Sequence, residues 1–198
     1  MNKYWPYTTL GIPDEMFNRN EVPMTKEEIR VLTLAKARLA PKQIVWDIGS
    51  GTGSLSVEAA LAVPGGTVYA VEKNPRGLEM TAANSERFGV KNVVLVPGEA
   101  PTALQGLPAP HRVLVGGSGG QLPQILALVK ERLLPGGRLV INAVTVETFS
   151  MCTKLLEGWC TGITQINISR SVPTGRVHLW RALNPVYIFT AEKDREEV

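Results

Sequence analysis

The stretch Val45-Trp46-Asp47-Ile48-Gly49-Ser50-Gly51-Thr52-Gly53-Ser54 decides the fold of this chain. It begins in an apolar run, Ile44 to Ile48, that a single acid interrupts, and it continues through three glycines in five residues. From Leu55 to Leu61 the pattern is compatible with a helix. A strand, a glycine-rich turn and a helix in this order are typical of a nucleotide-binding βα unit, because glycine lets the backbone pass close to a ligand and the helix N-terminus offers unpaired N–H groups.

The glycine spacing favours one class of nucleotide cofactor. Pyrophosphate cofactors are bound by G-x-G-x-x-G, whereas this turn reads G-x-G-x-G and is preceded by Asp47. The next predicted strand, residues 67–72, ends in Glu72, where an acid accepts hydrogen bonds from ribose hydroxyls. Together these features resemble the S-adenosylmethionine site of Rossmann-like methyltransferases. The spacing argues against a nicotinamide-dependent oxidoreductase. The alternative without a functional role is a glycine-rich turn that binds no ligand.

The composition is that of an ordinary globular chain with one domain. Its 198 residues are 44% hydrophobic, and no apolar run approaches the length of a membrane span. Residues 1–15 contain no apolar segment typical of a signal peptide, so we expect a cytoplasmic protein that does not bind membranes. Cys152 and Cys160 follow no metal-ligand pattern, so we expect no metal site. A net charge of +3 does not by itself indicate a nucleic-acid partner.

The order of predicted elements gives the fold class. Residues 1–24 read as an N-terminal arm, and residues 25–198 as one domain. Thr25-Lys26-Glu27-Glu28 has the pattern of a capping box, with Thr25 as the N-cap and Glu28 three residues into the first helix. Helices then alternate with strands at residues 44–48, 67–72, 93–96, 112–115, 138–142, 164–169 and 186–191. We therefore expect a Rossmann-like class I methyltransferase fold, of class α/β, with a mostly parallel seven-stranded sheet, helices on both faces and an antiparallel last strand.

Two strand exits should border the ligand site, because the carboxyl ends of parallel strands meet at one edge of the sheet. The loop after residues 93–96 holds Glu99 and Ala100, which are candidates to lie beside an adenine. The loop after residues 112–115 reads Gly116-Gly117-Ser118-Gly119-Gly120. It lacks the Asn-Pro-Pro-Tyr-like motif with which many nitrogen methyltransferases hold an amine. We interpret it as open space with bare N–H groups for a substrate, and a flexible connector is the alternative.

One segment near the C-terminus contains basic residues but no acidic ones. From Gly158 to Ala191 there is no Asp or Glu, while Arg170, Arg176 and Arg181 lie within it. Such a run is often only a solvated face, but in the part of a methyltransferase that builds the substrate side it also suggests an anionic substrate. Alternating strand geometry keeps the three arginines from all facing one pocket, and Arg176, after Gly175 in a predicted turn, is the favoured one.

These features together resemble one family, the decarboxylating (cobalt-)precorrin carbon-15 methyltransferases of cobalamin biosynthesis. The resemblance spans nearly the whole chain. It rests on the stretches Gly11 to Asp14, Pro23 to Glu28, Asp47 to Gly53, Gly98 to Pro101, Val115 to Gly120 and Glu147-Thr148. It implies methyl transfer from S-adenosylmethionine to a tetrapyrrole with loss of a ring carboxylate, and assembly as a homotetramer. It also implies cofactor contacts by Thr25, by the glycine turn, by Glu72 and by Ala100.

The residues and the resemblance together define the expected site. Cofactor binding is expected from Thr25, Asp47, Gly49, Ser50, Gly51, Thr52, Gly53, Glu72, Glu99 and Ala100. Substrate binding is expected from Gly117, Ser118, Gly119 and Arg176, with Glu147 and Arg176 as the candidates for a catalytic role. A methyltransferase acting on RNA or protein and a non-catalytic S-adenosylmethionine-binding subunit are the alternatives. The absence of an amine-binding motif after residues 112–115 counts against a methyltransferase that acts on RNA or protein. Only an activity assay distinguishes a non-catalytic subunit from an enzyme.

Overall fold

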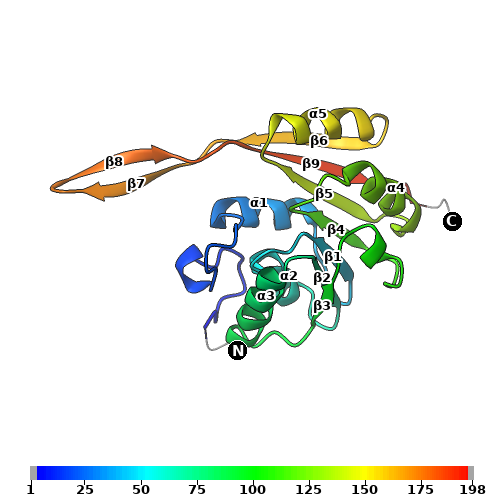
Figure 1. Ribbon diagram of the computed structural model, residues 1–198, viewed down its shortest axis with the longest axis horizontal. Coiled ribbons are helices and arrows are strands. Elements are labelled where there is room, and N and C mark those ends of the chain that lie inside the picture. The colour runs from blue at the N-terminus through cyan, green and yellow to red at the C-terminus, as the bar shows by residue number, and fades with distance from the viewer. Residues whose placement is uncertain (1–3, 196–198) are drawn as a thin grey trace.

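The computed structural model describes residues 4–195, which fold around one large sheet (Figure 1). The strands are β1 (Ile44–Ile48), β2 (Thr67–Glu72), β3 (Val93–Pro97), β4 (Arg112–Val115), β5 (Arg138–Ala143), β6 (Cys160–Ile166), β7 (Ser169–Thr174), β8 (Val177–Ala182) and β9 (Val186–Glu192). The α-helices are α1 (Glu27–Ala37), α2 (Ser54–Ala62), α3 (Pro75–Arg87), α4 (Leu122–Arg132) and α5 (Val146–Leu155).

Seven of these strands form the sheet in the order β3-β2-β1-β4-β5-β9-β6. Strands β1 to β5 pair in parallel, and β9 runs antiparallel to both β5 and β6. The predicted sheet with an antiparallel last strand is therefore confirmed. The strand order reverses between β1 and β4, and in open α/β sheets a ligand crevice lies beyond the carboxyl ends of the strands at this point.

Alternate residues of the strands supply two separate cores, one on each face of the sheet. On one face Val45, Val68 and Leu114 pack with Ile29 of α1 and Leu55 of α2. The other face is covered by α4 and α5, whose buried side chains pack against alternate residues of the same strands. Such alternation is what a sheet covered on both faces requires. None of the described helices is long and apolar enough to cross a membrane.

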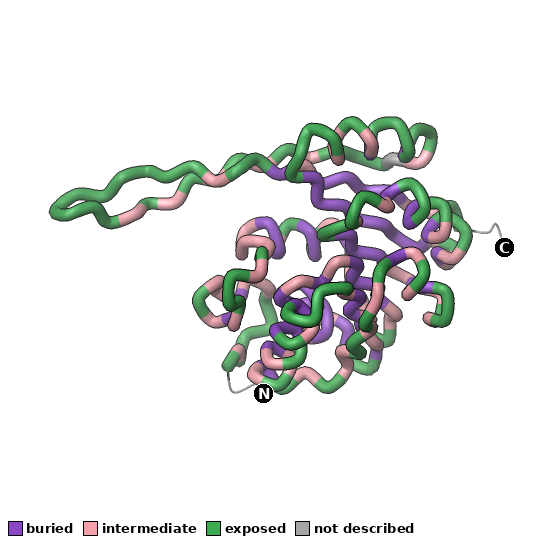
Figure 2. The backbone as a smooth tube through the Cα atoms, viewed as in Figure 1, coloured by how far each residue is buried: buried purple, intermediate pink, exposed green. Residues whose placement is uncertain are grey.

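The sequence analysis was wrong about the end of the sheet. It predicts a single strand at residues 164–169 between the last helix and the last strand, whereas the structure has β6, β7 and β8 there. Strands β7 and β8 pair with each other as a two-stranded hairpin that projects from the sheet (Figure 1). Figure 2 shows this hairpin exposed along most of its length, whereas the strands of the large sheet are mostly buried.

Candidate active site

The turn after β1 is built from three glycines that all adopt positive φ angles. Gly49, Gly51 and Gly53 have φ of 73°, 54° and 73°, a region that other residues rarely adopt. Space also demands glycine: a Cβ on Gly49 would lie 2.6 Å from the carbonyl oxygen of Gly117, and one on Gly53 would lie 2.7 Å from a methyl carbon of Thr81. The turn is therefore packed directly against the loop after β4 and against α3.

Glu72, at the end of β2, holds its carboxylate at the side of this turn. Its Oε2 accepts a hydrogen bond from the N–H of Gly51 at 2.9 Å, and its Oε1 accepts one from the N–H of Asn74 at 2.8 Å. The turn is also tied to β2 through the N–H of Gly49, which donates to the carbonyl of Val71 at 2.9 Å. A carboxylate placed in this way keeps lone pairs with which it can accept hydrogen bonds from ligand hydroxyls.

Asp47 lies beneath the turn and is fully buried. Its Oδ2 accepts a hydrogen bond from Ser56 Oγ at 2.5 Å, while its Oδ1 has no hydrogen-bond partner among the described residues. Burial raises the pKa of Asp47 to about 6, although the bond from Ser56 opposes the change. Thr52 Oγ1 is likewise buried and unpartnered within residues 4–195. Unpaired polar atoms at the turn fit a ligand that supplies polar and cationic groups there.

A cavity of about 680 Å³ opens beyond the carboxyl ends of the strands. It extends from the glycine turn, past the ends of β2 to β5, to the root of the β7–β8 hairpin. Most residues that the sequence assigns to ligand binding line it: Thr25, Gly49, Ser50, Gly51, Thr52, Glu72, Glu99, Ala100, Gly117, Ser118 and Gly119. The structure therefore brings residues from five separate segments of the chain to one cavity.

Four of the predicted site residues are not part of the cavity wall. Asp47 and Gly53 lie next to wall residues of the glycine turn, and Gly53 is the residue before α2. Glu147 is exposed in the first turn of α5. Arg176 lies in the two-residue turn between β7 and β8, at the end of the hairpin that is remote from the sheet (Figure 1). Glu147 and Arg176 thus stand outside the cavity of their own chain.

An ion pair borders the cavity near the end of β3. Lys73 Nζ lies 2.7 Å from Glu99 Oε1, and both side chains are about half exposed. The loop after β4 packs on this pair, since a Cβ on Gly119 would lie 2.8 Å from Glu99 Oε1 and 3.0 Å from Lys73 Nζ. The carboxylate of Glu99, predicted to lie beside the adenine, is therefore also the partner of Lys73.

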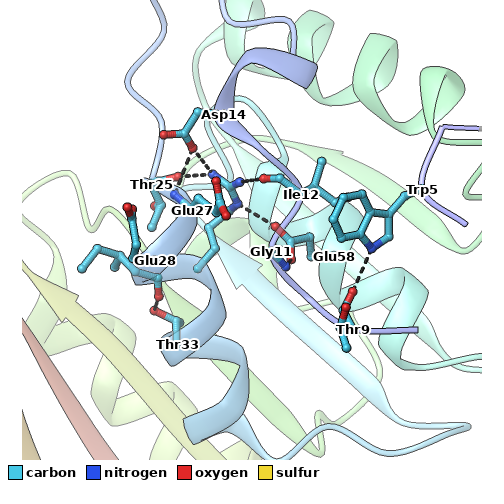
Figure 3. A network of polar contacts seen from close by, with 12 residues as sticks. Trp5, Thr9, Gly11, Ile12, Asp14, Thr25, Glu27, Glu28, Thr33 and Glu58 are labelled. Carbon is cyan, nitrogen blue, oxygen red and sulfur yellow. Dashed lines mark hydrogen bonds and ion pairs between the residues drawn. The ribbon is translucent and has the colours of Figure 1, made fainter. Parts of the chain in front are cut away.

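Figure 3 shows a network of polar contacts in which the arm residues Ile12 and Asp14 lie beside Thr25. Arg30 of α1, which is fully buried, joins them. Its guanidinium donates to Glu58 Oε1 at 2.8 Å, to Asp14 Oδ1 at 2.7 Å and to the carbonyl of Thr25 at 2.5 Å. The predicted capping box at Thr25 is wrong: α1 begins at Glu27, and Asp14 of the arm accepts the hydrogen bond from the Glu27 N–H at 2.9 Å. The cap thus comes from a residue distant in sequence, and Thr25 faces the cavity instead.

The same network extends to the hairpin through Arg170. Its guanidinium lies against both carboxylate oxygens of Glu28, at 2.8 and 2.5 Å, and against Asp14 Oδ2 at 2.9 Å. The structure therefore places Arg170 in ion pairs with the arm and α1, and not in the cavity wall. Arg181 lies opposite it on β8 and is exposed.

Sequence reasoning missed several residues of the wall. Lys26 directly follows Thr25, and its place in the Pro-Met-Thr-Lys stretch is the signal that could have found it. Asn142 stands near the end of β5, which the strand prediction located without assigning it a role. Six further wall residues surround the root of the hairpin, an element that the sequence analysis did not predict: Val144, Ile168, Ala182, Leu183, Asn184 and Val186.

Comparison with known proteins shows which family the chain belongs to. Residues 15–193 match a family described as "Precorrin methyltransferase domain". A "Probable cobalt-precorrin-6B C(15)-methyltransferase (decarboxylating)" of Pyrobaculum calidifontis is 46% identical over 192 residues, 94% of this chain and 98% of that protein. A "Cobalt-precorrin-6B C(15)-methyltransferase (decarboxylating)" of Salmonella typhimurium is 38% identical, over 93% of this chain and 97% of that protein.

Solved structures agree as well. A "Precorrin-6y C5,15-methyltransferase" from Geobacter metallireducens matches with a TM-score of 0.89 and 39% identity, covering 93% of this chain and 98% of that one. A "precorrin 8w decarboxylase" from Methanobacterium thermoautotrophicum matches with a TM-score of 0.87 and 36% identity, covering 91% and 98%. A tRNA methyltransferase from Aquifex aeolicus, at 16% identity and a TM-score of 0.72, shares only the fold. The chain, with its glycine turn, Glu72 and open loop around one cavity, therefore belongs to the precorrin methyltransferase family.

Proposed function

We propose that this chain transfers a methyl group from S-adenosylmethionine to carbon 15 of a (cobalt-)precorrin macrocycle, with decarboxylation of a ring acetate. The observation that carries the proposal is the single cavity that joins the glycine turn to the open Gly116 to Gly120 loop. One part of the cavity has the polar groups that can bind a nucleoside. The other part is lined by backbone and apolar side chains, which suit a flat substrate. The names of the relatives supply the reaction.

The chain would bind both the nucleoside end and the amino-acid end of the cofactor. Glu72 would accept hydrogen bonds from the ribose hydroxyls, and Ala100 with Glu99 would border the adenine. Thr25 and the residues from Gly49 to Gly53 would enclose the amino-acid portion, with Asp47 beneath them as the buried negative charge. When bound, S-adenosylmethionine supplies a methyl group that is already activated by its sulfonium.

The chain's own contribution to methyl transfer is alignment and exclusion of water. The nucleophile is a carbon of an electron-rich ring, so no strong protein base is required. Loss of carbon dioxide needs an electron sink, and the conjugated macrocycle of the substrate supplies it. Apolar residues of the wall, among them Val144, Ile168 and Leu183, would keep water from the reacting face. Glu147 and Arg176 stay candidates for a catalytic role only if a second chain brings them to the cavity.

Mass spectrometry tests the reaction directly. Purified protein is incubated with the tetrapyrrole and methyl-labelled S-adenosylmethionine, and the product should gain one labelled methyl group and lose one carbon dioxide. Transfer of label to tRNA or to protein, with the tetrapyrrole unchanged, would refute the proposal. Binding of the cofactor without transfer to any of these acceptors would identify a non-catalytic subunit.

We also propose that the protein forms a homotetramer, works in the cytoplasm, and has one catalytic domain at 25–198 preceded by the arm at 1–24. The hairpin supports the assembly, because Val177, Leu179 and Trp180 are 58%, 55% and 78% exposed on it. Isolated two-stranded ribbons are marginally stable in water, so such side chains need a covering surface. Light scattering should give a tetramer that Trp180→Ser weakens. A wild-type monomer at dilute concentration would contradict the assembly.

A further inference from the structure

The cavity wall carries an uneven set of charges. Glu72 and Glu99 contribute negative charge, and the ammonium of Lys73 is paired with Glu99. Lys26 also lines the cavity, and within the described part of the chain its ammonium is not in any ion pair or side-chain hydrogen bond. We propose that Lys26, assisted by Asn142, binds one peripheral carboxylate of the substrate. This inference rests on the proposed function and names how its substrate is held.

The position of Lys26 puts it on the substrate side of the cavity. It is the residue before α1, and Ile29 and Thr33 follow it on the same side of the helix at helical spacing. Ile29 lines the cavity, and Thr33 Oγ1 contacts Asn142 Oδ1 at 3.0 Å. This side of α1 therefore faces the end of β5.

The sheet order separates this region from the nucleoside partners. Glu72 ends β2 and Glu99 follows β3, both on one side of β1, whereas Asn142 belongs to β5, two strands away on the other side. The arm lies against the glycine turn, since a Cβ on Gly51 would lie 3.1 Å from the carbonyl oxygen of Pro23. From Pro23 the chain continues along the cavity wall to Lys26, toward the end of β5.

Asn142 offers a second polar partner in the same wall. It is only 8% exposed, and its Oδ1 lies 3.0 Å from Thr33 Oγ1. Its Nδ2 is buried and has no hydrogen-bond partner among residues 4–195, which is a costly state for an amide donor. The terminal torsion of asparagine is soft, so a small rotation turns this N–H toward an acceptor in the cavity. A carboxylate oxygen held by Lys26 provides that acceptor.

The surroundings strengthen the interaction and leave few other partners for the substrate. Val144, Ile168 and Leu183 make the adjoining wall apolar, and a charge-assisted hydrogen bond is stronger where water is excluded. Arg170 is engaged by Glu28 and Asp14, and Arg176 lies outside the cavity of its own chain. Among the described residues of one chain, Lys26 is thus the cation best placed for a substrate carboxylate.

The test compares Lys26→Met with Lys91→Met in the full-length protein. Lys91 is exposed in the loop before β3, at the opposite edge of the sheet, so its variant removes the same charge away from the cavity. The dissociation constant of the tetrapyrrole is measured by titrating its absorbance, and that of S-adenosylmethionine by calorimetry. Lys26→Met should weaken tetrapyrrole binding about 10-fold to 100-fold, as expected for a charge-assisted bond, and leave cofactor binding within about twofold. Lys91→Met should change neither.

A chemically modified substrate identifies the bond. The wild-type protein should bind a methyl-esterified tetrapyrrole less tightly than the free acid, whereas Lys26→Met should bind the two forms alike. Asn142→Asp has nearly the same shape but adds a negative charge. This charge should repel the substrate carboxylate, so the variant should bind the tetrapyrrole less tightly than the wild-type protein.

Three results would overturn the inference. Unchanged tetrapyrrole affinity in Lys26→Met would remove the residue from the substrate site. A loss confined to S-adenosylmethionine would assign Lys26 to the carboxylate of the cofactor. Equal discrimination against the ester by both proteins would place the carboxylate elsewhere. A wild-type protein that binds the tetrapyrrole without methylating it would instead refute the proposed function, and the binding comparison would still decide the role of Lys26.

Discussion

Replacement of Asp47 by Asn should make the protein more stable and less able to bind its cofactor. Asp47 is fully buried beneath the glycine turn, with one oxygen bonded to Ser56 and the other unpartnered among the described residues. Asparagine has nearly the same shape and stays neutral at every pH. The substitution therefore removes a buried charge without opening a cavity.

The raised pKa of Asp47 sets the size of the expected gain in the free energy of unfolding. Burial raises this pKa from 3.8 to about 6 in the folded protein. Because the folded state holds the proton more tightly, the free energy of unfolding falls as the pH rises from about 4 to about 6. A tenfold difference in proton affinity between the folded and unfolded states corresponds to about 1.4 kcal/mol, so the ionised side chain costs about 3 kcal/mol at neutral pH. Asp47→Asn avoids this cost, and its advantage should be close to zero near pH 4.

Urea unfolding of both proteins at several pH values is the assay. At about pH 7.5 the variant should unfold with a free energy about 2–3 kcal/mol higher, and its Tm should rise by about 4–12 °C for a domain of this size. The gain should shrink steadily on acidification. Calorimetry on the same samples should give weaker S-adenosylmethionine binding for the variant. A gain of equal size at all pH values, or no gain near neutrality, would refute the reasoning about the buried charge.

Four further substitutions test other parts of the structure. Arg30→Met leaves the buried carboxylate of Glu58 without its cation and takes one of two arginines from Asp14, so it should lower the free energy of unfolding by about 3–5 kcal/mol in urea titrations; an unchanged midpoint would contradict this. Gly117→Val points its side chain into open space, so this variant should retain the wild-type Tm and cofactor affinity but lose turnover. Gly49→Ala should fold poorly, because Gly49 has a positive φ and a Cβ there would lie 2.6 Å from the carbonyl oxygen of Gly117. Glu72→Ala should weaken S-adenosylmethionine binding by about 1.5–3 kcal/mol in calorimetry, and an unchanged affinity would exclude Glu72 from the site.

The parts of the fold that were predicted correctly are those with local signals. The first four strands end near the predicted positions because each is a short apolar run that stops at a glycine, a proline or an acid, and β5 ends at Ala143, one residue beyond its predicted end. Helix α3 likewise has a local signal at its start, since Asn74 directly before Pro75 accepts a hydrogen bond from the Arg76 N–H at 3.0 Å. Residues at the carboxyl ends of these strands met in one cavity because parallel strands bring those ends together.

The parts that were missed depend on contacts between distant segments. Strands β7 and β8 carry Pro173 and many polar residues, and they contribute little to the core, so neither the apolar pattern nor its alternation marks them. The cap of α1 comes from Asp14, which no spacing rule connects with Glu27. Lys26 and Asn142 became candidates only when the cavity placed in one wall an ammonium and an amide N–H that have no partner among residues 4–195.

The ion pairs of Arg170 have a consequence for the order in which the chain is completed on the ribosome. Its partners Glu28 and Asp14 precede it by 142 and 156 residues, so both emerge long before it does. At about 5–20 residues per second, they wait several seconds or longer for this partner. The first five strands can already pair during this interval, but the rim of the cavity cannot close. A nascent chain can therefore form the five parallel strands of its sheet before the rim of its cavity is complete, and premature termination before Arg170 should leave the arm unanchored at its outer side.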